Sequence, residues 1–401
     1  MTSLKDLIRD PSVAELALIA QYAALKPDAA RERAFKAFAN TGLPHRRMEA
    51  WKWSDFKARL KTLEATAPAR SDPFKSLGGH VISLNGKTVE GLDGLPSGIR
   101  VIVKDQGHGF AAPEAVPLGA LTAALTRQTI VFEVSEQITA PIRLVYTGSG
   151  EAAFSRLAFV IRDGASLDVI ESHLGGAALN SALTSFELKE GARATRTLIQ
   201  PPAPGEATAI TSQIHLDAKA HFTQTLLAFG GDMTRIETRA VHQDPEAELV
   251  MNAAYLAGEG YHIDLTSHVR HGGRNCVTKQ QTKGAVMAGG TGIFQGKFHV
   301  PMNVGQQTDA DMQHNALLLE EGAVVNAKPE LEIYADDVEC AHGNTCGALD
   351  AEQLFYLRQR GIPEAQAKAM LTEAFVAEAL ETGFEGADEI MLEATRGWLS
   401  G

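Results

Sequence analysis

Turn-forming residues recur every 27 residues through the middle of this chain. The turns begin at Asp163, Glu190, Asp217, Asp244 and His271, and each of these residues is followed by Gly, Ala or Pro. Runs rich in β-branched and aromatic residues flank each turn, and no helical pattern of about 10 to 15 residues separates the runs. A fixed period is typical of stacked repeats. Extended segments without an intervening helix therefore predict a β-helix, in which each coil adds strands to parallel sheets.

Two irregularities in the repeat leave an alternative open. Ile214 and Leu216 are displaced by one residue from the inward and outward phase of Phe186 and Leu188. After the fifth turn, the next similar turn begins at Glu321, 50 residues further on. An up-and-down antiparallel sandwich with fortuitous turn spacing is the alternative to the β-helix.

The N-terminal end is predicted to be helical. Ser12 and Glu15 have the spacing of a capping box. A second helix is expected between about Asp28 and Gly42, and residues 66–76, rich in Ala, Pro and Ser, are expected to form a linker. The first helix carries apolar side chains at positions i, i+3, i+4 and i+7, namely Leu16, Ile19, Ala20 and Ala23.

Helical patterns return from Asp350 onward. Asp350 and Gln353 form a cap-like pair, Gly361 ends this helix, and Pro363 occupies the first position of the next one. A last helix includes Trp398. The second helix carries an apolar stripe made of Met370, Leu371, Ala374 and Phe375.

These patterns predict three domains. A helical domain with its linker covers residues 1–75, a β-helix core covers 76–346, and a second helical domain covers 347–401. An open terminal coil of a solenoid exposes unpaired strand edges. We therefore expect a helical cap at each end of the repeat body.

Net charge and cysteine content exclude several classes of protein. Lys and Arg total 37 and Asp and Glu total 49, which gives a formal charge of −12. A negative long-range field disfavours nucleic acid and anionic membranes as partners. Three cysteines cannot build a disulfide framework, and the sequence has neither a signal-peptide pattern nor an apolar run of about 18 residues that could cross a bilayer. We therefore expect a cytoplasmic protein.

The densest group of reactive side chains lies between residues 334 and 346. Cys340, His342 and Cys346 are ligand types for soft or borderline metals. In an extended strand Cys340 and His342 point to the same face, with Cα atoms about 7 Å apart. That distance would let them share a metal or a cluster, or face one partner surface. A buried cysteine beside a satisfied histidine, or a surface loop, are the structural alternatives.

Three other motifs are better explained as structure. The segment 289–297 resembles a P-loop but has Thr291 where the first glycine should be and Phe298 in place of the Mg²⁺-binding Ser or Thr, so a turn between coils is favoured. The histidines around Asp264 are expected to be structural. The Trp51-Lys52-Trp53 segment is expected to anchor the N-terminal domain to the body.

Several long motifs resemble those of one family. The run NAKPELEIYADDVECAHG at 326–343 strongly resembles the signature of the SufB/SufD family of Fe–S cluster assembly scaffolds, and LFYLRQRGI at 354–362 continues the resemblance. Upstream, FQGK at 294–297 belongs to the same pattern. The N-terminal WKWS at 51–54, with the Gly, Leu, Pro, Arg and Glu residues before it, resembles the SufD branch rather than the SufB branch.

The resemblance implies a fold, partners and site residues. It implies a right-handed parallel β-helix flanked by helical domains, in a complex with the paralogue SufB and two copies of the ABC-type ATPase SufC. His342 matches a histidine at the SufB interface that is a candidate ligand of the cluster, and Cys340 is a weaker candidate. The helices from about 350 to 382 match the SufC-docking region. Their candidate docking residues are Leu354, Phe355, Tyr356, Arg358, Arg360, Met370 and Phe375.

The same resemblance implies a division of labour. SufC would hydrolyse ATP, and this chain would be a scaffold without an ATP site, sharing a nascent Fe–S cluster transiently with SufB. The sequence leaves open whether the isolated chain forms a homodimer and whether a reduced flavin binds the complex. It also leaves open whether this chain itself ligates iron, and what Cys276 and Cys346 do.

Two other functions compete with the scaffold. A β-helix carbohydrate-active enzyme would need paired acids and aromatic sugar platforms, but the adjacent Asp336 and Asp337 would point to opposite faces of a strand, and aromatic residues make up only 6% of the chain. A purely structural or binding solenoid is the second alternative.

Overall fold

The computed structural model describes residues 8–64, 67–104 and 116–400. The helices are α1 (Val13–Ala23), α2 (Ala29–Ala39), α3 (Phe56–Arg59), α4 (Pro117–Leu125), α5 (Ala351–Gln359), α6 (Glu364–Ala377) and α7 (Ala387–Leu399), with short 3₁₀ helices η2 (Glu49–Trp51) and η3 (Pro73–Ser76). The first strands are β1 (His80–Leu84), β2 (Val89–Glu90), β3 (Ile99–Lys104), β4 (Thr129–Val134), β5 (Ile142–Tyr146), β6 (Gly150–Ile161), β7 (Ser166–His173), β8 (Ala177–Leu188), β9 (Arg193–Gln200) and β10 (Ala203–Leu216). They are followed by β11 (His221–Ala228), β12 (Gly231–His242), β13 (Glu248–Ala257), β14 (His262–His271), β15 (Val277–Val286), β16 (Thr291–Val300), β17 (Asp309–Leu318), β18 (Val324–Ile333) and β19 (Glu339–Gly347).

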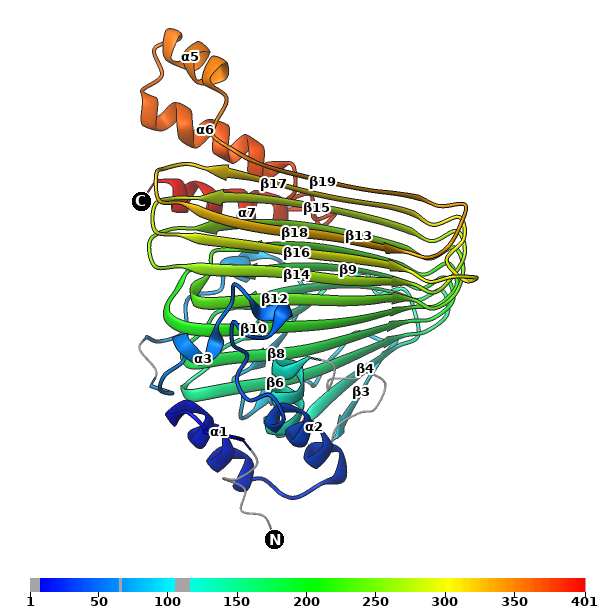
Figure 1. The fold of residues 1–401 in the computed structure, drawn as a ribbon. Coiled ribbons are helices and arrows are strands. Elements are labelled where there is room, and N and C mark those ends of the chain that lie inside the picture. The colour runs from blue at the N-terminus through cyan, green and yellow to red at the C-terminus, as the bar shows by residue number, and fades with distance from the viewer. Residues whose placement is uncertain (1–7, 65–66, 105–115, 401) are drawn as a thin grey trace.

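The strands form two facing sheets that together make a parallel β-helix (Figure 1). From β4 onward the even-numbered strands build a 9-stranded sheet with β3, and the odd-numbered strands build a 10-stranded sheet with β1 and β2. Every pairing is parallel except β1 with β2 and β3 with β4. The β-helix prediction is confirmed, and the antiparallel sandwich is wrong.

Strand register explains the displaced phase near Ile214. Leu188 pairs with Leu216 and Leu216 pairs with His242, so two successive steps of 28 and 26 residues average to the 27-residue period. Ile214 therefore pairs with Phe186 and points into the interior like it. The one-residue shift preserves the buried face because side chains alternate along a strand.

The turn at Glu321 belongs to the opposite edge of the β-helix. It joins β17 to β18, and Gly289, in the turn between β15 and β16, donates its N–H to the carbonyl of Gly322 at 3.3 Å. The row of turns that starts near Asp163 instead continues through Asn275 and Gln307, whose N–H donates to Asp337. The apparent 50-residue gap is thus a comparison between two different edges.

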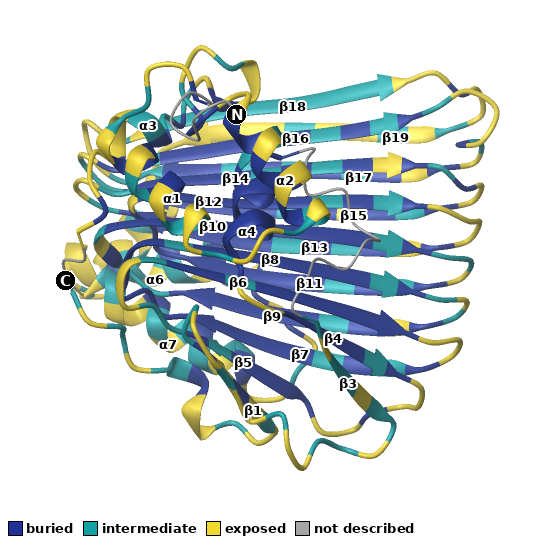
Figure 2. Ribbon diagram, turned by 90° about the horizontal axis from the view of Figure 1, so that it is seen from below, coloured by how far each residue is buried: buried dark blue, intermediate teal, exposed yellow. Residues whose placement is uncertain are grey.

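The N-terminal helices cover the outer face of the 9-stranded sheet (Figure 2). The capping box at Ser12 and the helix that begins at the Asp28 cap are confirmed. The apolar stripe of α1 is wrong: Leu16 is exposed, whereas Leu18 is fully buried. The sequence shows where apolar residues recur, but the neighbouring helix and sheet decide which side of α1 is covered. Helix α4, inserted between β3 and β4, was not predicted.

The C-terminal helices cover the outer face of the 10-stranded sheet rather than the end of the β-helix. Met391 of α7 and Val376 of α6 are buried in one cluster with outward-facing strand residues such as Leu227 and Leu256. The same cluster buries Phe74 of η3, so the end of the predicted linker packs on the body. The expected helical cap at each end is therefore wrong, because the helices bury their apolar faces against the sides of the sheets, where outward apolar residues are available.

Two local predictions agree with the observed backbone. The P-loop-like segment is a turn at Gly289 followed by strand β16, whereas a P-loop leads into a helix. Gly361 has φ +83° and follows the end of α5, as expected for a helix C-cap. Pro363 is the residue before α6 rather than its first residue.

Candidate functional site

The last coil of the β-helix ends without a covering element among the described residues. Strands β18 and β19 are the outermost strands of their sheets, so one side of each lacks a strand partner. On β19, Cys340 and His342 are register partners of Ala310 and Met312, which are buried in the interior. Side chains in the same register column point the same way. The inward-facing row of the last coil therefore faces outward from the end of the solenoid.

Cys340 and His342 share this inward-facing row but have different environments. Cys340 is half-buried against the apolar interior, and burial raises the pKa of its thiol, with the nearby Asp309 carboxylate as a smaller cause. His342 is exposed, and its imidazole makes no hydrogen bond to any part of the chain that the structure describes. A thiol with a raised pKa is a poorer ligand at neutral pH, because metals bind the thiolate. Of the two, His342 is the more accessible donor.

Cys346 lies on the same row, four positions beyond His342, above a buried polar chain. Tyr255 Oη lies 3.0 Å from His314 Nε2, and His314 Nδ1 lies 2.6 Å from Asn344 Oδ1 on β19. Burial lowers the pKa of His314 to about 4, so its ring is neutral at pH 7. This buried chain, which sequence reasoning missed, fixes the inner side of the strand that carries His342. Its only sequence signal was the pair of glycines, Gly284 and Gly292, that leave room for Tyr255.

The three cysteines do not converge. Cys276 is fully buried, its Sγ lies 3.4 Å from the carbonyl of Asp244, and burial raises its pKa. Cys340 and Cys346 lie six residues apart on one strand, about 20 Å along it. Within residues 8–64, 67–104 and 116–400 there is no group of three or more His, Cys, Asp or Glu side chains that could hold a metal ion. Metal chemistry at His342 would therefore need ligands from another molecule.

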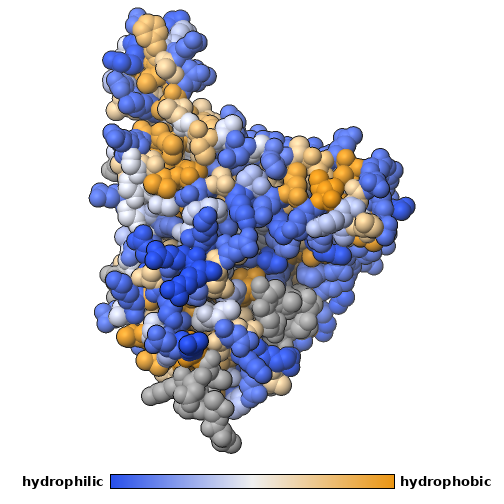
Figure 3. Space-filling view, viewed as in Figure 1, coloured by the Kyte–Doolittle hydropathy of each residue, from blue (hydrophilic) through white to orange (hydrophobic). Residues whose placement is uncertain are grey.

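The helices that follow β19 carry most of the exposed apolar side chains at this end. Helix α5 has no buried residue and projects from the body (Figure 1), and Phe355 is 64% and Tyr356 57% exposed. Met370 of α6 is 43% exposed. The hydropathy surface shows the apolar side chains along this projection, and a second apolar area lies at the edge of the last coils (Figure 3).

Not all of the predicted docking residues are free. Phe375 packs against the β-helix, with Lys283 Nζ 4.5 Å from its ring centroid. Arg358 is paired with Glu364, and the Arg360 guanidinium donates to Tyr356 Oη at 2.9 Å. Leu354 is half-buried on α5. The adjacent Asp336 and Asp337 lie in a turn, not in a strand as assumed, and Asp337 has φ +57°.

The Trp51 segment and the buried histidines have structural roles. The Arg235 guanidinium lies 3.8 Å from the Trp51 ring centroid, which confirms the predicted anchor. His262 lies 3.0 Å from Ser54 Oγ, and His271 lies 2.9 Å from Thr278 Oγ1. Burial lowers the pKa of both rings to about 4.

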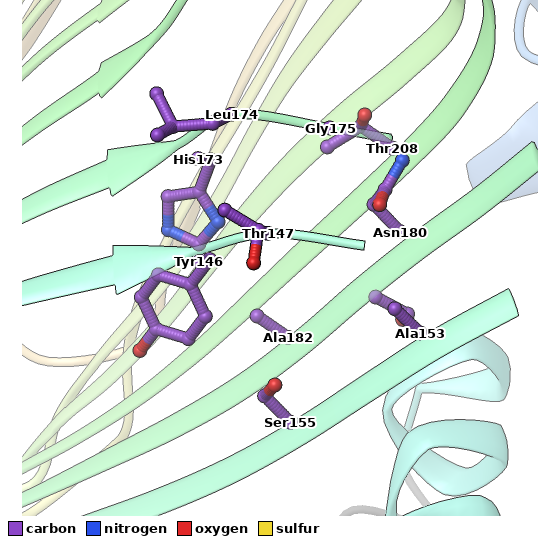
Figure 4. A pocket seen from close by; sticks show the side chains of 11 residues that line it. Tyr146, Thr147, Ala153, Ser155, His173, Leu174, Gly175, Asn180, Ala182 and Thr208 are labelled. Carbon is purple, nitrogen blue, oxygen red and sulfur yellow. The ribbon is translucent and has the colours of Figure 1, made fainter. Parts of the chain in front are cut away.

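A small cavity near the first coils offers no comparable site. Figure 4 shows the rings of Tyr146 and His173 at its wall, with centroids 4.2 Å apart. Its volume of about 20 Å³ is enough for a single water molecule. His173 is held by Glu171, which Arg196 pairs in turn, and these contacts lower the pKa of Glu171 to about 2 against its burial.

The fold and this end of it define a parallel β-helix scaffold with an uncovered terminal coil and a projecting helical arm. Residues 144–375, more than half of the chain, match the family model described as SUF system FeS cluster assembly, SufBD core domain. The chain belongs to this family of Fe–S cluster assembly proteins.

Individual relatives agree with the family. The chain is 28% identical to the iron-sulfur cluster assembly protein SufD of Escherichia coli, over 85% of each chain. It is 24% identical to an iron-sulfur cluster assembly SufBD family protein of Synechocystis, over 88% of this chain and 86% of the relative. It is 26% identical to a SufBD family protein of Mycobacterium tuberculosis, over 68% and 71% of the two chains. The described helices include none that is long and apolar enough to cross a membrane.

Proposed function

We propose that this chain is the non-ATPase scaffold subunit of an Fe–S cluster assembly complex. It would pair with a SufB-type paralogue through its terminal coil and dock a SufC-type ATPase through α5 and α6. The observation that carries the proposal is the uncovered inward-facing row of β19, with His342 exposed in it. The whole complex, including the ATPase, would be cytoplasmic, and the nascent cluster is its cargo.

The terminal coil is suited to a partner built on the same plan. A second β-helix could pair its own edge strand with β18 or β19 and bury the inward residues that now face solvent. Apolar side chains at this edge, Ile333 and Tyr334, are 39% and 57% exposed. Their burial would favour association, and each Å² removed from water contributes roughly 25 cal/mol.

His342 would supply one ligand to a cluster assembled at that contact. A neutral imidazole binds iron without adding negative charge, and a mixed ligand set would ease release of the cluster to a carrier. The remaining ligands would be thiolates of the paralogue, because the cysteines of this chain are buried, raised in pKa or too far apart.

Helix α5 would transmit force from the ATPase to the terminal coil. It follows β19 after only three residues, Ala348–Asp350, so a displacement of α5 pulls directly on the strand that carries His342. Dimerisation of two ATPase copies on ATP would draw the docking helices of the two scaffold subunits together and open the interface between them.

The test is a co-expressed complex of the three subunits, loaded anaerobically with iron and sulfide. His342→Ala should abolish the visible absorbance of the cluster while both partners still co-purify. His221→Ala, a histidine paired with Glu248 at the turn edge, is the matched control and should load normally. An unchanged cluster yield in His342→Ala would show that this ring is not a ligand. Failure to recover either partner would refute the scaffold.

A further inference from the structure

A basic cleft lies at the N-terminal end of the β-helix, remote from His342. Three segments far apart in the sequence line it: the loop 24–28 between α1 and α2, the hairpin residues 87–89 between β1 and β2, and the link 127–128 between α4 and β4. Arg31 of α2 completes the lining. The cleft has a volume of about 770 Å³, which falls within the range of small-molecule sites.

The cleft concentrates positive charge in a chain whose net charge is −12. Its lining includes Lys26, Arg31, Lys87 and Arg127, against a single carboxylate, Asp28. The side chains of Lys26, Lys87 and Arg127 are exposed, and none forms an ion pair with the described part of the chain. Four cations left uncompensated around one concave surface repel one another, and a bound anion would remove that repulsion.

Arg31 is held rigidly in the wall of the cleft. It is only 8% exposed, and its Nη1 donates to the carbonyls of Ala124 and Thr126 at 2.5 and 3.0 Å. Its buried Nε has no acceptor among the described residues. A guanidinium remains charged in proteins. A preordered, incompletely satisfied cation is the kind of group that recognises a phosphate oxygen.

Asp28 adds an acceptor beside the cations. Its Oδ1 caps α2 by accepting from the N–H of Ala30 at 3.1 Å, while its buried Oδ2 has no donor among the described residues. A ligand hydroxyl or amino group would satisfy this oxygen. Leu25 and Val89 supply apolar lining for a ring.

We propose that this cleft binds a phosphate ester of nucleotide size. Its phosphates would lie on Lys26, Lys87, Arg127 and the Nε–H of Arg31, and a hydroxyl or amino group would donate to Asp28. The ligand would bridge α1, α2, the β1–β2 hairpin and the start of β4, which Figure 2 shows grouped at one end of the molecule. Binding would therefore tie the N-terminal helices to the first coils and raise the melting temperature.

Calorimetric titration of the full chain with ADP, at low ionic strength, tests the proposal. ADP should bind, and adenosine, which lacks phosphate, should bind at least about tenfold more weakly. Inorganic pyrophosphate should bind more weakly than ADP. Equal affinity for pyrophosphate and ADP would reduce the cleft to an inorganic phosphate site and overturn the role of Asp28.

Two charge-matched variants separate a built site from general attraction. Lys87→Glu with Arg127→Glu should weaken ADP binding by about tenfold or more. Arg274→Glu with Lys279→Glu makes the same change in net charge near the other end of the solenoid, on exposed residues outside the cleft, and should leave the affinity within about twofold. Equal weakening by both pairs, or no ADP binding at millimolar concentration, would overturn the proposal. Circular dichroism of each variant confirms that it is folded.

Discussion

Ser54 donates a hydrogen bond at 2.5 Å to Asp264, a residue 210 positions later in the chain. Both residues are fully buried, on the outer face of β14. Because the single hydroxyl proton points to Asp264, His262 donates to the same Oγ through Nε2–H at 3.0 Å. The three residues form no catalytic triad, since the serine lies between the acid and the histidine. They instead fasten the N-terminal segment to the β-helix.

Replacing Ser54 with Ala should weaken this attachment. The change removes one hydrogen bond to a buried carboxylate, which still keeps Arg235 at 2.8 Å, so we expect a loss of about 1 to 3 kcal/mol in the free energy of unfolding. Urea unfolding monitored by tryptophan fluorescence measures the change. Ser83→Ala on β1, an exposed serine, should cost less than about 0.5 kcal/mol. Equal stability of the two variants would contradict the structural role.

Polar replacement of the exposed aromatic residues of α5 should separate docking from folding. Phe355→Ser with Tyr356→Ser removes no buried contact, so the melting temperature of the isolated chain should change by less than about 2 °C. In the co-expressed complex the ATPase should be lost on washing. Val13→Ser, an apolar residue 66% exposed on α1, is the matched control and should retain it. Full retention of the ATPase by the α5 variant would refute docking through these side chains.

The buried histidines should make the fold acid-sensitive. Burial lowers the pKa of His314 to about 4, below the usual value near 6.5, so the unfolded chain takes up a proton between these values while the folded chain does not. The stability that His314 contributes is therefore fully present above about pH 6.5 and is lost as the pH falls toward 4. His314→Gln should reduce the fall in unfolding free energy over this window by roughly 1 to 3 kcal/mol. Urea titrations at pH 7.5, 6.0 and 5.0 give the slope, and an unchanged slope would contradict the prediction.

A methyl group added at Gly292 should disturb the interior beneath the last coils. A Cβ there would lie 2.4 Å from the ring of Tyr255, which is fully buried and bonded to His314. We expect Gly292→Ala to cost about 1 to 3 kcal/mol of stability. Gly78→Ala places its Cβ in open space at an ordinary backbone conformation and is the control. Thermal unfolding of both variants decides, and equal melting temperatures would show that the Tyr255 ring can move aside.

The period of the turns predicted the β-helix because it depends on local features. A coil consists of two strands and two turns, and strand length and turn chemistry repeat along the chain. The exact register was not readable in the same way. Leu188, Leu216 and His242 are spaced by 28 and then 26 residues, and only the ladder of backbone hydrogen bonds reveals that the two steps compensate.

The candidate site was predicted in part. The alternation of a strand placed Cys340 and His342 on one face, and the capping residues located α5 and α6 near their observed positions. The buried partner of that strand, the chain from Tyr255 through His314 to Asn344, was not predicted. Its members lie on three strands, β13, β17 and β19, and meet only because the coils stack.

By itself, the sequence determined the repeating architecture, the family resemblance and the residues of the terminal strand, since these depend on neighbouring positions and on motifs. Tertiary structure alone decided which surfaces are covered. The helices bury their apolar faces on the sides of the sheets, as Val376 does, and leave the inward row of β19 uncovered. Coverage depends on contacts between residues hundreds of positions apart, such as Ser54 and Asp264, and local periodicity contains no information about them.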